Sequence, residues 1–255
     1  MREILGRRRR KRSALPAAAL TCAEQWKWPV LPGAGTRPRP LRDRFAERAG
    51  GIGAADGGGD AAGGSGGRRA RGDRRRTVRC CACPRPDCPV PGAHPHDPPL
   101  LAATTDPAMV RWWWAQRPDA PIVVATGGAV AAVSLPAAAG ARVLDYFDAL
   151  HVRTGPVVAT PTRHVLLVAP FGFDELGELL VRQENVPTSL RYHGPGGYVV
   201  LPPSRTGRGT VRWERPPAAA DGAPGGAPWL PRVGDLLDAL VAASTATPDG
   251  SRLAY

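Results

Sequence analysis

The sequence is short of lysine, methionine and aromatic residues, and it has no long uninterrupted run of apolar side chains. Only Lys11 and Lys27 among its 34 basic residues are lysines, so arginine carries nearly all of the positive charge. The apolar stretch after the basic N-terminus soon reaches Glu24 and Gln25. It is too short to cross a bilayer or to act as a secretory signal. We therefore expect a cytoplasmic protein without a membrane partner.

The basic residues outnumber the 22 acidic ones and give a formal net charge of +12. An excess of this size is typical of proteins that bind nucleic acid or another polyanion. The arginine bias, with 31 Gly and 29 Pro, also has a simpler origin in GC-rich coding DNA. Much of the excess lies in two tracts, 7–12 and 68–76, which can supply only a sequence-independent attraction to phosphates.

Composition divides the chain into six segments: a basic tail (1–13), a first helix and strand (14–32), a Gly/Arg-rich insert (33–79), a folded domain with a Cys/His knuckle (80–217), a Pro/Gly linker (218–231), and a C-terminal helix and tail (232–255). The insert contains almost nothing that could build a core, so it is predicted to be disordered, like the basic tail. The C-terminal helix is predicted to stand alone beyond its linker.

The folded domain alternates short apolar runs with amphipathic stretches. This pattern predicts an α+β fold with a mixed or antiparallel sheet and flanking helices. The runs 120–126 and 129–135 predict a strand pair around a Gly127-Gly128 turn. The next helix is predicted over 136–150, with four residues facing inward: Val143, Leu144, Phe147 and Leu150.

Three consecutive tryptophans, 112–114, lie on a well-marked helix. Asp106 is a strong N-cap and Pro107 suits the first helical position. Trp113 and Trp114 share one face with the apolar residue Val110, and exposed tryptophans could stack on bases. We expect at least one or two of the three to belong to the core.

Four soft or borderline metal ligands lie within a short stretch: Cys81, Cys83, Cys88 and His94. Zinc favours tetrahedral sulfur and nitrogen ligation, and a closed set of four protein ligands is typical of a structural site. Cys80 and His96 could substitute for members of this set. The alternatives are reduced loop cysteines or a disulfide, which a cytosolic compartment disfavours.

Several motifs occur in one order along the chain: "WKWPVLPG" (26–33), "ATTDPAMVRWWW" (103–114), "PIVVATGG" (121–128), "HGPGGYVVLPPS" (193–204) and "VRWERPP" (211–217). In this order and rough spacing the chain resembles the N-terminal domain of bifunctional DNA primase-polymerases. These belong to the archaeo-eukaryotic primase superfamily, which is common in actinobacteria and mobile elements. The resemblance covers 26–32 and 80–217, with the Gly/Arg-rich segment as an insertion. It implies a role in DNA replication and a split sheet-and-helix core.

The resemblance also implies a site where carboxylates hold two Mg²⁺ or Mn²⁺ ions for nucleotidyl transfer. Members of the family carry an Asp-x-Asp pair where this sequence has Ser134 and Pro136. The third acid of the family corresponds to Arg191. His164 matches the family's nucleotide-binding histidine. The chain is therefore expected to be catalytically degenerate, and to need Mg²⁺ or Mn²⁺ only if activity survives.

Three functional hypotheses follow. The first is a degenerate domain that binds DNA or a nucleotide through an anion pocket, formed by Arg191, Arg205, Arg208 and Arg212 with His164 and His193. The second is an active nucleotidyltransferase with relocated acids, although the candidates at 145–148 and 174–178 are typical of solvated helix faces. The third is a zinc-stapled module that binds a protein partner.

Overall fold

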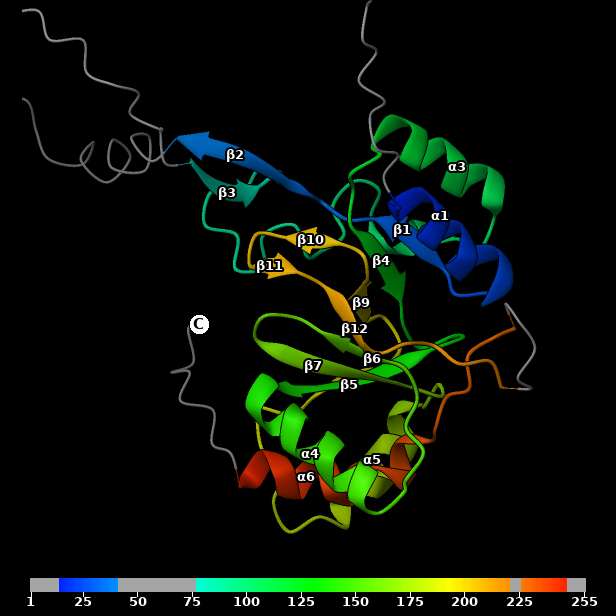
Figure 1. The fold of residues 1–255 in the computed structure, drawn as a ribbon, viewed down its shortest axis with the longest axis vertical. Coiled ribbons are helices and arrows are strands. Elements are labelled where there is room, and N and C mark those ends of the chain that lie inside the picture. The colour runs from blue at the N-terminus through cyan, green and yellow to red at the C-terminus, as the bar shows by residue number, and fades with distance from the viewer. Residues whose placement is uncertain (1–13, 41–76, 221–225, 247–255) are drawn as a thin grey trace, which may run out of the picture.

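The computed structural model describes residues 14–40, 77–220 and 226–246. They form an α+β fold with two main antiparallel sheets, each covered by helices, and two two-stranded sheets (Figure 1). One apolar core lies between the sheets and extends to the N-terminal helices, and a second lies beneath the C-terminal helices. The predicted fold class is confirmed. No helix in this described part of the chain is both long and apolar enough to cross a membrane.

The first sheet has the strand order β1-β4-β9, with bounds Val30–Pro32, Ile122–Ala125 and Tyr198–Leu201. Helix α1 (Leu15–Leu20) continues into a π-helical turn, η1 (Thr21–Gln25). Both pack against α3 (Pro107–Gln116), which follows the 3₁₀ turn η2 (Leu100–Ala102). The motifs at 26–33, 103–114 and 193–204 contain β1, α3 and β9, so this part of the fold brings together segments that lie far apart in the sequence.

Helix α3 begins as its sequence predicts. The Asp106 side chain accepts a hydrogen bond from the Ala108 backbone N–H at 2.9 Å. Trp113 and Trp114 are buried, whereas Trp112 is 59% exposed. The expectation that part of the tryptophan triplet belongs to the core is therefore confirmed.

The second sheet has the strand order β12-β6-β7-β5-β8, with bounds Arg212–Arg215, Val157–Ala159, Arg163–Val168, Ala131–Pro136 and Arg191–His193. Three helices, α4 (Ala137–Ala149), α5 (Phe173–Val181) and α6 (Leu237–Thr245), lie on one side of it (Figure 1). On β5, Val133 and Leu135 point toward these helices, while Ala132 packs toward the first sheet. Because side chains alternate along a strand, Ser134 points to the same side as Ala132.

The predicted strand pair around Gly127-Gly128 is wrong. β4 pairs with β1 and β9, whereas β5 pairs with β7 and β8 in the other sheet. Both runs are almost entirely apolar and buried, so neither shows the alternation that would mark a two-stranded hairpin with one solvated face. Gly127, at φ +102°, turns the chain from one sheet to the other.

The prediction of an isolated C-terminal helix is also wrong. Helix α6 packs on α4 and β5, and Leu237 and Leu240 are fully buried in the second core. The 3₁₀ turn η3 (Val233–Asp235) precedes it. The described end of the predicted linker is hydrogen-bonded to the domain, since the Ala169 N–H donates to the Pro231 carbonyl at 2.8 Å. The contacts of this helix were missed because the Pro/Gly-rich stretch before it is typical of a linker between separate units.

Two further boundaries in the structure differ from the predicted ones, the end of α4 and the ends of the Gly/Arg-rich insert. Leu150 is 54% exposed rather than inward-facing, because α4 ends at Ala149. The ends of the predicted disordered insert are ordered, since β2 (Thr36–Pro40) pairs with β3 (Thr77–Cys81). The remainder of that insert, 41–76, and the basic tail lie outside the described residues.

A short hairpin, β10 (Arg205–Thr206) and β11 (Gly209–Thr210), follows the Pro-Pro-Ser loop. Ser204 ends this loop in a fixed position, because its hydroxyl accepts a hydrogen bond from the Ile122 N–H at 2.8 Å. The motif at 193–204 therefore carries the chain from the edge strand β8, through β9, directly to the hairpin.

Candidate functional site

The five-stranded sheet brings two of the predicted degenerate positions together. Ser134 on β5 lies opposite Arg191 on β8 in the antiparallel register. Pro136 lies two residues further along β5 and therefore on the same face, opposite Arg163 of β7. The three positions that the resemblance assigned to metal-binding acids therefore lie on one face of this sheet.

Arg163 is a residue of this group that sequence reasoning missed. Its guanidinium donates to the Ser134 hydroxyl at 3.2 Å through Nε and to the Ser134 carbonyl at 2.6 Å through Nη2. The same Nη2 lies 2.6 Å from the Ser189 carbonyl, just before β8. Two features could have indicated Arg163: it is the neighbour of His164 in the sequence, and it begins the strand that pairs with β5. We call Ser134, Arg163, Arg191 and His193 the cationic cluster.

His193 completes this cluster, with Nε2 3.0 Å from the Ser134 hydroxyl. Burial, and then the positive charges of Arg163 and Arg191, lower the pKa of His193 to about 4. The imidazole is therefore neutral at pH 7. Because Arg163 donates to the Ser134 oxygen, the hydroxyl can donate its own proton to His193 Nε2.

The lowered pKa of His193 predicts a pH-dependent stability. The unfolded chain binds a proton at its usual pKa near 6.5, while the folded protein resists protonation down to about 4, so stability falls as the pH drops through this window. Between pH 7 and pH 5 we expect the loss to be about 2 kcal/mol. Urea unfolding of the wild type and His193→Gln at both pH values isolates this contribution as the difference between the two proteins. An equal pH dependence in both would contradict it.

His164 lies on the other face of the sheet. It is opposite Leu135 in the register, 8% exposed, and its Nδ1 is 3.1 Å from the Ala137 carbonyl at the start of α4. Its Nε2 lies 3.8 Å from the Glu214 carboxylate, which also pairs with Arg212. The strand pleat thus separates His164 and Arg212 from the cationic cluster, so the six residues of the expected anion pocket do not form a single pocket.

Arg205 and Arg208 are both exposed on the β10–β11 hairpin. The Arg208 guanidinium donates to the Pro89 carbonyl at 3.0 Å, within the Cys/His knuckle. These two arginines therefore belong to a surface beside the knuckle.

The described part of the chain holds no cluster of carboxylates that could bind a metal ion. Its one group of three or more His, Cys, Asp or Glu side chains placed to hold a metal ion is the Cys/His knuckle. Two acids of the candidate helices pair with arginines, Asp148 with Arg215 at 2.6 Å and Glu175 with Arg232 at 3.2 Å. The donor set around Ser134 therefore does not fit Mg²⁺ or Mn²⁺, which prefer carboxylate oxygens.

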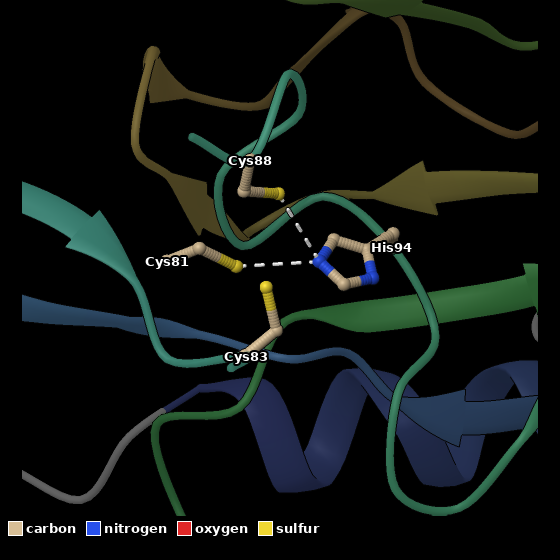
Figure 2. A group of neighbouring side chains, drawn as sticks. All are labelled: Cys81, Cys83, Cys88 and His94. Carbon is tan, nitrogen blue, oxygen red and sulfur yellow. Dashed lines mark hydrogen bonds between the residues drawn. The ribbon is translucent and has the colours of Figure 1, made fainter. Parts of the chain in front are cut away.

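The knuckle brings its four predicted ligands together (Figure 2). Their ligand atoms all lie within 4.8 Å of one another, and His94 Nε2 is 3.2 Å from the Cys81 sulfur and 3.4 Å from the Cys88 sulfur. His94 Nδ1 lies 2.6 Å from the Pro95 carbonyl, which orients Nε2 toward the sulfurs. The proposed substitutes, Cys80 and His96, are not part of this group. Three thiols and an imidazole could hold a metal such as zinc.

Hydrogen bonds prepare the thiol of Cys81 for a cation. Although burial raises its pKa, N–H groups of Cys83 and Gly92 and neighbouring side chains bring the pKa of Cys81 down to about 6. The Gly92 N–H donates to the sulfur at 3.2 Å. Burial and the adjacent Cys81 thiolate raise the pKa of Cys88 to about 11.

A family model described as "Bifunctional DNA primase/polymerase, N-terminal" matches residues 19–228. The chain belongs to this family. No curated protein and no solved structure matches it. The match begins within α1 and ends at Pro228, which forms an isolated β-bridge with Ala219. It therefore stops before helix α6, although α6 packs on α4 and β5. The resemblance drawn from the sequence motifs is thereby confirmed.

Proposed function

We propose that this primase-polymerase domain is catalytically degenerate and binds the phosphates of single-stranded nucleic acid or of a nucleotide without a divalent metal. The observation that carries the proposal is the pairing of Ser134 with Arg191 across β5 and β8, with the Arg163 guanidinium bonded to Ser134. Cationic and neutral groups thus occupy the positions of the family's acids.

Two-metal nucleotidyl transfer needs carboxylates that hold two cations about 4 Å apart. A guanidinium at this place repels those cations, and a serine hydroxyl cannot neutralise them. Loss of the metals removes several kcal/mol of transition-state stabilisation. Of the polar positions that the family uses, His164 remains, and it is held under α4 away from Ser134.

The same groups favour a phosphate. A guanidinium donates parallel hydrogen bonds to two phosphate oxygens, and Arg191 is exposed beside the buried Ser134. His193 is neutral at pH 7, so the positive charge of the cationic cluster comes from Arg163 and Arg191. A net charge of +12 adds a long-range attraction to any polyanion.

For the knuckle we propose a structural zinc ion held by Cys81, Cys83, Cys88 and His94. The set supplies four protein ligands, which leaves no open position for a reacting water. The ion would fasten β3 to the loop that ends at His94.

Binding of a labelled single-stranded oligonucleotide at low salt tests the phosphate-binding proposal. We expect the same affinity with and without Mg²⁺ at matched ionic strength, because no described carboxylate group recruits the ion. Arg191→Glu should weaken binding about tenfold, as expected when an attractive contact of about 1 kcal/mol becomes repulsive. Fluorescence anisotropy measures both effects.

Arg142→Glu is the matched control, because it makes the same change in charge on an exposed residue of α4. It should weaken binding much less than Arg191→Glu. Equal effects of the two changes would show that only overall charge matters. Binding that appears only with Mg²⁺ would contradict the proposal.

A further inference from the structure

We propose that a metal ion in the knuckle positions the β10–β11 hairpin, so that phosphate contacts by Arg205 and Arg208 depend on the metal. The inference rests on the proposed function for the identity of the ligand. The link between metal and hairpin rests on contacts within the protein alone.

The hairpin docks on the loop between the third and fourth ligands of the knuckle. The Gly207 N–H donates to the Pro91 carbonyl at 2.7 Å. One residue further along, the Arg208 guanidinium donates to the Pro89 carbonyl at 3.0 Å. Both acceptors lie between Cys88 and His94, so fixing these two ligands also fixes the two carbonyls.

The docking is close as well as hydrogen-bonded. A Cβ atom built on Gly207 would lie 2.5 Å from the Pro91 Cβ, a distance that ordinary packing does not allow. Glycine therefore lets the hairpin tip meet the proline ring. A displaced loop would lose this fit and weaken both hydrogen bonds.

The hairpin has little stability of its own. It pairs two residues on each strand, Arg205 with Thr210 and Thr206 with Gly209. The Thr206 hydroxyl adds one bond to the Gly209 carbonyl at 3.2 Å. Its base is held by the buried Val211, whose N–H donates to the Ser204 carbonyl at 2.9 Å. Isolated two-stranded hairpins are marginal in water, so the knuckle contacts decide how well the tip of this hairpin is ordered.

A polyanion can contact both parts at once. A pocket of about 510 Å³ at the knuckle is lined by three of its ligands, Cys83, Cys88 and His94, and by Arg85, Pro89, His96 and Tyr198 among others. Arg208 is bonded to Pro89 in this lining, which places its guanidinium beside the pocket. The exposed residues Arg85 and Arg208 thus offer two cations to a single strand.

Hydrogen exchange of the full chain tests the coupling without any nucleic acid. Protein loaded with zinc is compared with protein stripped by a chelator that is then removed by dialysis. We expect amides of residues 205–211, including the Gly207 N–H, to exchange about tenfold faster without zinc. The reason is that losing the docking hydrogen bonds makes local opening of the hairpin about tenfold more favourable. The amides of β5 and β7 report whether the domain stays folded. Unchanged exchange at 205–211 while zinc leaves the protein would overturn the inference.

Gly207→Ala disrupts the contact between the hairpin and the knuckle loop without changing any of the four metal-ligating residues. In the zinc-loaded protein it should speed exchange at 205–211 and weaken oligonucleotide binding about fivefold, as removal of zinc does. Gly128→Ala is the control, because nothing lies within 4 Å of a Cβ built there. If zinc-loaded wild type fails to bind the oligonucleotide, the proposed function fails while exchange still decides the coupling. Faster exchange with unchanged binding would overturn the claim that the hairpin contacts phosphates.

Discussion

Cys81→Ser is expected to lower the free energy of unfolding of the zinc-loaded protein by about 4 kcal/mol. A ligand that binds only the folded state at a thousand times its dissociation constant adds that much stability. Cys81 has the central place in the knuckle, since its sulfur lies 3.2 Å both from His94 Nε2 and from the Gly92 N–H. Without this thiolate the ion should be lost and its contribution to folding with it.

Urea unfolding with and without zinc measures this effect. The variant and the wild type should differ strongly in zinc and only slightly when both are metal-free. Cys80→Ser is the matched control, because Cys80 is the neighbouring cysteine outside the ligand group. Equal losses from both substitutions, or a loss from Cys81→Ser that persists without zinc, would show that the thiol acts through packing alone.

Gly140→Ala is expected to destabilise the protein by about 2–3 kcal/mol, although alanine is the better helix former. A Cβ at this position of α4 would lie 2.4 Å from His164 Nδ1 and 2.5 Å from its Cβ. The buried imidazole has no room to withdraw, because the Ala137 carbonyl holds it from the same helix. Either the helix or β7 must move.

Gly177→Ala is the control within another helix. Position 177 lies inside α5, is exposed, and has nothing within 4 Å of an added Cβ. There alanine should stabilise the protein by about 0.5–1 kcal/mol. Thermal unfolding of both variants gives the comparison. The same sign at both positions would refute the claim that His164 is clamped under α4.

The features that local chemistry determines could be predicted from the sequence. The spacing of three cysteines and His94 identified the knuckle, because its ligands are close in the chain. The Asp106 cap and the face shared by Trp113 and Trp114 identified α3. Family resemblance placed Ser134 and Arg191, and the sheet register then brought these two positions together.

The features that long-range packing determines could not be predicted. The apolar runs of β4 and β5 fit either strand of a hairpin or two separate sheets, and only the partners β9 and β7 decide. The pleat of β7 places Arg163 in the cationic cluster and turns the adjacent His164 to the opposite face. Nothing local indicates which of two neighbouring polar residues faces the site.

A template-directed primer-extension assay tests the proposed loss of two-metal catalysis most directly. The protein is first shown to be folded and zinc-loaded, and is then assayed with nucleotides and either Mg²⁺ or Mn²⁺, beside an active polymerase as assay control. Because Ser134, Pro136 and Arg191 cannot hold the two ions, we expect no product even at high protein concentration. A template-dependent product that appears with the wild type would contradict this conclusion.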